Sequence, residues 1–344
     1  GIGGTSSDYI NAIAETSDGG YIVGGYFYSS SIDLGNGIIL NNQSNSTNYT
    51  DGMVIKYGSS GGVEWAQKIG GDDDDSITSV SKTSDGGYIV GGYFKSSSID
   101  LGNGISLANS GSSDGMVIKY DSSGEVEWTR GIGEMDSDSI SSVLETTDGG
   151  YIVGGCFTDN IDLGNGLSLS NKGKEDGMII KFEKTELPNP TVIQAQGIGG
   201  THEDKINSVS ETRDGGYIVG GYFSSSIDLG NGISLTNKGS TSHTDGMIIK
   251  YNSAGEVEWA EGIGGTSDDR ISSVSETRDG GYIVGGYFSS SIGLGNGISL
   301  TNKYSDNADG MLIKYNATGE VEWAEGIGGT YEDEINSVSE TSDG

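Results

Sequence analysis

Aspartates recur at a fixed phase along this sequence, and they are its residues best suited to binding chemistry. One series stands in short acidic loops, at Asp8, Asp75, Asp138, Asp204 and Asp269. A second series opens a Gly-rich "DLGNG" stretch, at Asp33, Asp100, Asp162 and Asp228, while Gly293 breaks it. Carboxylate, amide and backbone oxygens in such loops are ligands that calcium accepts. The second series is therefore a candidate calcium site, although aspartates that bond to their own backbone form turns equally well, and the sequence favours that interpretation.

Catalytic chemistry has little support in the remaining residues. The chain has two histidines and one cysteine, and no serine or cysteine motif of a nucleophilic enzyme accompanies them. Acidic residues are so frequent that the presence of two carboxylates cannot identify a glycosidase. We therefore expect no enzymatic activity, with a polysaccharide-active enzyme kept as an alternative.

Loops that differ between copies of a constant pattern are candidate ligand contacts. After the "DLGNG" stretch the sequences diverge, as in "NNQSNSTNYT", "TNKGSTSHT" and "TNKYSDNA". Variable loops on a constant scaffold are typical of binding surfaces. The predicted binding residues are therefore the first aspartate series together with Asn45, Tyr49, His243 and Tyr304.

A tandem repeat positions all of these residues. The motif "GIGGTSSDYINAIAETSDG" at Gly1 returns in variant form at Lys68, Gly131, Gly197, Gly262 and Gly326, in steps of 67, 63, 66, 65 and 64 residues. The predicted blades span residues 1–67, 68–130, 131–196, 197–261 and 262–325 of one repeat domain, and residues 326–344 begin a sixth copy.

Each repeat contains four segments with strand character, separated by turn residues. In the fourth repeat these are "INSVSE", "YIVGGYF", "GMIIKY" and "EVEWAEG". The second is apolar on both faces, as in a strand covered on both sides, whereas the fourth alternates and therefore has one face in water. Four strands in about 64 residues predict an all-β propeller of five four-stranded blades, with a surplus sixth inner strand.

The order of these signals resembles the bacterial β-propeller repeats of the SBBP type. The similarity rests on "IGG", the acidic loop, "DGGYIVGG", "DGMVIK" and the "G-x-V-x-W" strand, and it covers all five repeats. The inserted "SSSIDLGNGISL" element and the Met of "DGM" depart from that pattern. The resemblance implies a bacterial protein that is exported or exposed on the cell surface, and it implies no enzymatic activity.

Antiparallel strands bring the two candidate loop types to one face. In a four-stranded blade the connection between the second and third strands leaves the same end as the connection to the next blade. The acidic loops and the variable loops should therefore form one surface.

Composition restricts the partners. Fifty acidic against eighteen basic residues give a formal net charge of -32, which argues against nucleic acid and anionic membranes as partners. No apolar run is long enough to insert into a membrane. We expect an extracellular or cell-surface scaffold for adhesion or recognition of a protein or carbohydrate ligand. The alternative is a fibre subunit that self-associates through Gly1–Gly19 or Gly326–Gly344, since an exposed strand edge can pair with another chain.

Overall fold

Every regular element in the described part of the chain is a β-strand. The computed structural model describes residues 1–43, 48–184, 190–303 and 307–341, and all 30 elements in these ranges are strands. The predicted binding residues Asn45 and Tyr304 lie outside the described residues. Among the residues that the structure describes, no helix is long and apolar enough to cross a lipid bilayer.

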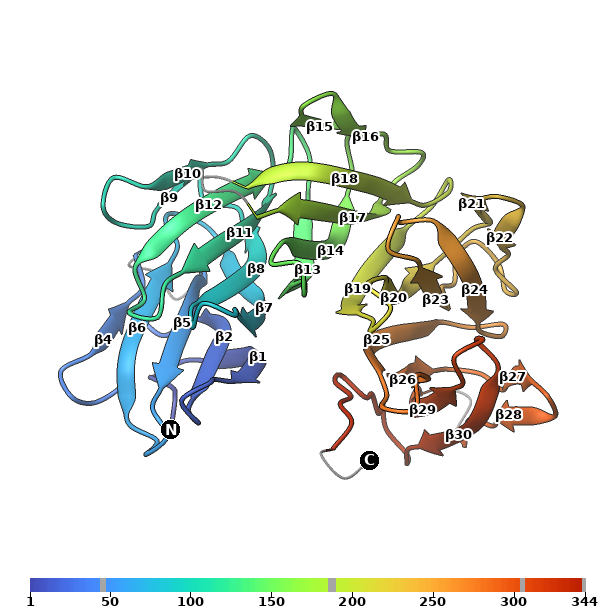
Figure 1. Cartoon of the computed structure of the whole chain (residues 1–344). Coiled ribbons are helices and arrows are strands. Elements are labelled where there is room, and N and C mark those ends of the chain that lie inside the picture. Colours follow the sequence, from blue (N-terminus) through green and yellow to red (C-terminus); the bar gives the residue numbers. More distant parts are fainter. Residues whose placement is uncertain (44–47, 185–189, 304–306, 342–344) are drawn as a thin grey trace. The chain divides into compact units, whose positions relative to one another are not determined.

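The repeat builds five four-stranded antiparallel sheets, so the predicted all-β, bladed fold class is confirmed (Figure 1). The first strands are β1 (Asp8–Glu15), β7 (Asp75–Lys82), β13 (Ser139–Glu145), β19 (Asp204–Glu211) and β25 (Asp269–Glu276). The second strands are β2 (Tyr21–Phe27), β8 (Tyr88–Phe94), β14 (Tyr151–Phe157), β20 (Tyr217–Phe223) and β26 (Tyr282–Phe288).

The third and fourth strands complete each blade in sequence order. The third strands are β5 (Asp51–Tyr57), β11 (Asp114–Tyr120), β17 (Asp176–Glu183), β23 (Asp245–Tyr251) and β29 (Asp309–Tyr315). The fourth strands are β6 (Val63–Ile69), β12 (Val126–Ile132), β18 (Thr191–Ile198), β24 (Val257–Ile263) and β30 (Val321–Ile327).

The inserted element forms a two-stranded hairpin of its own in every repeat, which the sequence alone did not indicate. These hairpins are β3 (Ser31–Asp33) with β4 (Ile39–Asn41), β9 (Ser98–Asp100) with β10 (Ser106–Ala108), β15 (Ile161–Gly164) with β16 (Leu167–Leu169), β21 (Ile227–Gly230) with β22 (Ile233–Leu235), and β27 (Ile292–Gly295) with β28 (Ile298–Leu300). Figure 1 labels both strands of the hairpins β9–β10, β15–β16, β21–β22 and β27–β28. In the fifth blade Ile292 and Leu300 are buried in the same cluster as Phe288, which anchors the hairpin to the blade.

Successive blades pack at the first of the two glycines of "YIVGGYF", whereas the second glycine lies against the first strand of its own blade. A Cβ added to Gly91 would lie 2.7 Å from the Ile140 side chain of the next blade. A Cβ on Gly92 would lie only 2.0 Å from the Ser76 carbonyl oxygen of its own blade. Only glycine permits this approach, because any side chain would occupy the space of its neighbours. We call the contact between the first glycine and the next blade the glycine seam.

Contacts divide the chain into two compact units. The first consists of Gly1–Val153, Phe157–Ser170 and Ile180–Ala195, and the second of Gly154–Cys156, Asn171–Ile179 and Gln196–Gly344. The first unit thus holds the first two sheets, the second unit holds the last two, and the third sheet contributes residues to both.

The sixth copy occupies the place of a first strand without forming a ladder. The residues after Ile327 are not assigned to a strand as far as Thr341. Ile335 and Val338 nevertheless contact Gly285 in the same way as Ile271 and Val274 contact Gly220. The segment therefore completes a glycine seam through these side chains and a backbone hydrogen bond from Ile335 to Gly286, without the regular pairing of the other first strands.

Candidate binding surface

Two loops meet at one end of each blade, as the strand directions predict. One is the acidic loop before the first strand of a blade, and the other is the hairpin insert that follows the second strand. In the second blade Asp75 accepts the backbone N–H of Ser96, the second residue after β8, at 3.2 Å. We call the end of the blade that carries both loops the loop face.

The first aspartate series holds this face together from inside. Each of these aspartates accepts the N–H of the residue four positions earlier and an N–H that lies 20 or 21 positions later, beyond the second strand; the series is Asp8, Asp75, Asp138, Asp204 and Asp269. All except Asp8 are buried. Their carboxylates therefore fix the two loops, and a direct contact of this series with a ligand stays a prediction.

Burial changes the acidity of these groups. Removal from water raises the pKa of Asp75 to about 7, although hydrogen bonds from Ser96 and Gly71 oppose the change. The same cause raises the pKa of Asp204 and of Asp269 to about 7 and that of Asp138 to about 6. In all four cases the charge of a second aspartate adds to the rise.

The second aspartate series forms exposed turns. Each side chain accepts the N–H of the glycine two residues later at 2.9 Å; these are Asp33, Asp100, Asp162 and Asp228. The next residue is an asparagine with a positive φ, which is 55° at Asn36. Among the described residues no group of three or more acidic, histidine or cysteine side chains could hold a metal ion. The turn-forming interpretation thus has a structural basis, and calcium binding stays a prediction.

Two pockets open on the loop face of the first unit. One of about 400 Å³ is lined by Gln43, Tyr49, Gly71, Asp72, Ser97 and Ser98. The other, of about 480 Å³, is lined by Glu134, residues 160–162 and residues 166–170. Each pocket combines an acidic loop with the insert of the repeat that this loop begins. Tyr49 is 40% exposed, which leaves its ring available to a ligand.

His243 lies in the corresponding loop of the fourth repeat. Its backbone carbonyl accepts a hydrogen bond from the Asn237 side chain, and its ring Nδ1 is 3.7 Å from Asp268. Tyr49 is held through the same backbone contact from Asn42. Among the predicted tip residues, Tyr49 and His243 are therefore equivalent positions with different side chains.

Buried lysines hold the opposite end of four of the five blades, at Lys56, Lys119, Lys250 and Lys314, and the sequence did not indicate their partners. Lys119 is fully buried, with its ammonium 3.0 Å from Asp85 and 2.8 Å from Glu127. Asp85 belongs to the "SDGG" turn, and Glu127 alternates with Val126 and Trp128 in β12. The sequence nevertheless contained a pattern that predicts the glutamate partner. In four of the repeats a lysine interrupts an apolar run and a glutamate follows eight residues later.

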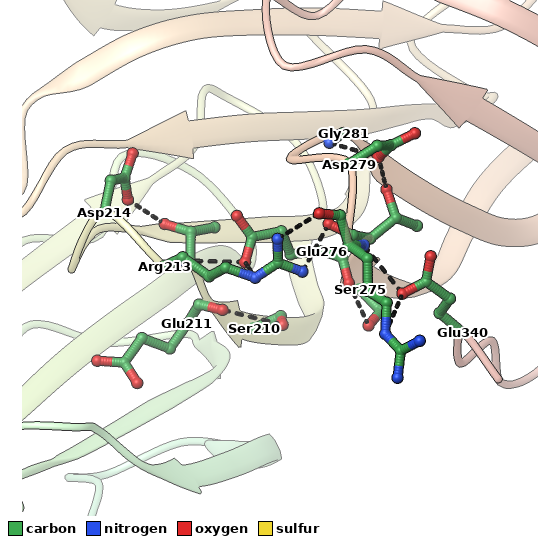
Figure 2. Close-up of polar contacts among 12 residues, drawn as sticks. Ser210, Glu211, Arg213, Asp214, Ser275, Glu276, Asp279, Gly281 and Glu340 are labelled. Atoms are coloured by element: carbon green, nitrogen blue, oxygen red, sulfur yellow. Dashed lines mark hydrogen bonds and ion pairs between the residues drawn. The ribbon is translucent and has the colours of Figure 1, made fainter. Parts of the chain in front are cut away.

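Charged contacts also join neighbouring blades at this end. The backbone N–H of Arg213 donates to Glu276 at 3.0 Å, and its guanidinium donates to the carbonyl oxygens of Thr277 and Arg278. Figure 2 shows this contact and the position of Glu340 one repeat further on, where Glu340 accepts the N–H of Arg278. Because these side chains bind groups of the neighbouring repeat, we assign them a structural role in holding adjacent repeats together.

Comparison with known proteins supports no family assignment. No family model matches the sequence. The chain is 23% identical over 347 aligned positions to the regulatory protein FlaEY of Caulobacter vibrioides, covering 95% of this chain and 34% of that protein. It therefore spans about a third of that relative.

Solved structures match this chain only at low similarity. A Bacteroides caccae protein of unknown function has 10% identity and a TM-score of 0.43, over 94% of this chain and 83% of that one. The Neurospora crassa Pan2 WD40 domain has 11% identity and a TM-score of 0.36, over 94% and 91%. An extracellular domain of a two-component system from B. thetaiotaomicron has 12% identity and a TM-score of 0.39, over 93% and 33%.

Proposed function

We propose that this chain is a non-catalytic recognition module of an exported bacterial protein, and that it binds carbohydrate through the loop face. The observation that carries the proposal is the contrast between a repeated frame and its variable tips. The buried aspartates fix the loops identically in successive blades, whereas the two pockets above them have different linings. Such a frame presents different side chains without altering the scaffold.

The pocket beside Tyr49 has the chemistry that a saccharide needs. It sets an aromatic ring beside an amide, a carboxylate and hydroxyl groups, contributed by Gln43, Asp72 and Ser97. Apolar contact with a few placed polar groups is the usual composition of a small-molecule site. Its volume of about 400 Å³ lies within the common range for such sites.

Exchange of one tip tests the proposal. Replacing residues 41–50 with the shorter tip of the second repeat, "ANSGSS", should remove binding on a glycan array while leaving the melting temperature nearly unchanged. Tyr49→Ala should weaken the same binding at least tenfold, and Tyr21→Ala is the control, because Tyr21 is a similarly exposed tyrosine in β2. Retention of all glycan binding after the exchange would refute the loop face. Binding of proteins but of no glycan would refute the carbohydrate assignment.

Self-association is the second candidate, and one observation favours it. Ile10 and Ile13 of β1 are 45% and 64% exposed, whereas the equivalent Ile77 and Val80 are buried in a glycine seam. Sedimentation over a range of concentrations tests this candidate. We expect assembly that Ile13→Lys abolishes; a monomer at every concentration would reject it.

A further inference from the structure

A second buried aspartate lies behind each acidic loop. Asp51, Asp114, Asp176 and Asp245 begin the third strands of their blades and are at most 2% exposed. In each of them Oδ2 accepts one backbone N–H, from Gln43, Ser110, Lys172 and Lys238 respectively. Oδ1 is equally buried but has no hydrogen-bond partner in the described structure. An ionised carboxylate oxygen in that situation is strongly destabilising.

At one junction the unpartnered oxygen and an oxygen of the acidic-loop aspartate lie beside the same glycine. Between the second and third blades, a Cβ built on Gly133 would lie 2.6 Å from Asp114 Oδ1 and 2.7 Å from Asp138 Oδ2. Both oxygens therefore border the same small volume beside this glycine. The Asp51, Asp176 and Asp245 side chains take the same position against Gly70, Gly199 and Gly264.

The surroundings of the Asp114 and Asp138 pair are themselves acidic. Glu134 faces Asp114 from the acidic loop, and Asp159 faces Asp138 from the loop after β14. The other pairs each have one lysine beside the third-strand aspartate, namely Lys68, Lys172 and Lys238, with Glu175 and Asp268 as further acidic neighbours. Two like charges buried at one site do not both ionise, so each pair needs a compensating cation or proton.

The carboxylate oxygens at each junction suit a proton better than a metal ion. Calcium takes six to eight oxygen ligands, and among the described residues no group of three or more acidic, histidine or cysteine side chains is placed to hold a metal ion. Asp138 already accepts the N–H groups of Glu134 and Thr158, and such donors repel a cation. A proton needs only the two oxygens that face each other.

We propose that each of these four blade junctions binds one proton between its two aspartates. Asp114 carries the proton on Oδ1 and donates it to the Asp138 carboxylate, which the N–H groups of the loops keep ionised. The proton is taken from water when the blades pack and returns to water when the pH rises. The two carboxylates then repel each other across the junction, so the junction is weakened as the pH rises through about 6.

The pKa values of both aspartates are raised, which is the direction that a shared proton requires. Burial, with a contribution from the facing Asp114, raises the pKa of Asp138 to about 6, and burial raises the pKa of Asp114 as well. The two groups titrate as one unit. Because the folded state binds the proton more tightly than the unfolded chain, the stabilisation is complete below about pH 4 and is lost as the pH rises through 6.

Carboxyl carbon NMR titration of the intact chain tests the proposal directly. We expect a pair of aspartate signals from Asp114 and Asp138 that titrate together near pH 6. In Asp114→Asn the amide donates permanently to Asp138, so the Asp138 midpoint should fall by at least one pH unit. Asp100→Asn, which removes an exposed charge, should leave the pair unchanged. Completion of every aspartate titration below pH 5 in the wild type would overturn the proposal.

Unfolding provides the second measurement. The slope of the logarithm of the unfolding constant against pH gives the number of protons that unfolding releases or takes up. Between pH 5 and 7 this number should be smaller by about one in Asp114→Asn than in Asp100→Asn. If Asp114→Asn does not fold, Asp245→Asn makes the same change between the fourth and fifth blades, and the wild-type titration requires no variant. A melting temperature that calcium chloride raises in the wild type but not in Asp114→Asn would overturn the proposal in favour of a metal ion.

Discussion

A buried ammonium group in four of the five blades shows how a single residue can connect a turn and a strand. Lys119 reaches the "SDGG" turn through Asp85 and β12 through Glu127, and it also donates to the carbonyl of Tyr120. Its partners are about half exposed, at 42% and 46%, whereas Lys119 itself has no contact with water. The two sides of the network therefore differ in what their removal leaves behind.

Removal of the cation and removal of its partners should have unequal effects. Lys119→Met leaves two carboxylates that water can reach, so we expect a loss of about 1 kcal/mol or less in the free energy of unfolding. The double variant Asp85→Asn with Glu127→Gln leaves a buried ammonium without a counter-ion, and it should cost about 3 kcal/mol. Urea unfolding at neutral pH measures both. Equal losses would contradict the assignment of Lys119 as the buried member.

The elements depend on glycine where they approach one another. Gly92 lies where β7 and β8 of one blade approach each other closely, and its neighbour Gly91 packs against the next blade. Gly131, in contrast, lies in β12, where a methyl group added to it would have only the Leu107 side chain nearby, at 3.8 Å. These positions make a matched pair within one blade.

We expect Gly92→Ala to destabilise the protein by at least about 3 kcal/mol or to prevent folding, because the methyl group would overlap the backbone of Ser76. Gly131→Ala should change the free energy of unfolding by less than about 1 kcal/mol, since the space is open and alanine is compatible with a strand. Chemical denaturation of the two variants compares them. A Gly92→Ala protein as stable as Gly131→Ala would show that β7 and β8 do not approach each other as closely at Gly92 as described.

The hairpin inserts depend on asparagine in the left-handed region. Asn231 has φ of 52° in the turn between β21 and β22. Asn231→Val should cost about 1–2 kcal/mol, because a β-branched side chain is unfavourable there. Asn231→Gly is the control and should be nearly neutral. Thermal unfolding detects the difference, and an unchanged Asn231→Val melting temperature would contradict the turn geometry.

At the scale of the molecule, two sets of aspartates act in opposite directions on stability. Hydrogen bonds and the nearby lysines outweigh burial and lower the pKa of Asp85 and of Asp214 to about 2. Their contribution is present above about pH 4 and is lost as the pH falls through 2. Burial raises the pKa of Asp75 and of Asp204 to about 7, so their contribution is lost as the pH rises from 4 to 7.

The melting temperature should therefore be highest near pH 4 to 5 and fall on both sides. Repulsion within a chain of net charge -32 also favours lower pH, but salt screens that effect. Melting curves between pH 2 and 8 at low and high salt separate the two causes. A flat profile from pH 5 to 8 at high salt would contradict the role of the buried aspartates.

Much of this architecture was predictable because it is repeated. The alternation of "EVEW" and the doubly apolar "YIVGGYF" identified the strands to within one or two residues, as Tyr217–Phe223 shows. The partner of an aspartate was not predictable, because pairing Asp114 with Asp138 requires the next blade to be in place. For the same reason, the first aspartate series could be assigned to the loop face but not recognised as buried.

The repeated glycine seam also determines how such a sequence can change in length. A Cβ added to Gly24 would lie 2.6 Å from Ile77 of the second blade, and a Cβ added to Gly220 would lie 2.6 Å from the equivalent Ile271 of the fifth blade. A genetic exchange between the DNA of equivalent positions in two repeats would therefore join half-blades that still fit, adding or deleting a whole blade. A deletion of one residue within a strand reverses every following side chain, so selection should tolerate changes of about 64 residues better than changes of one.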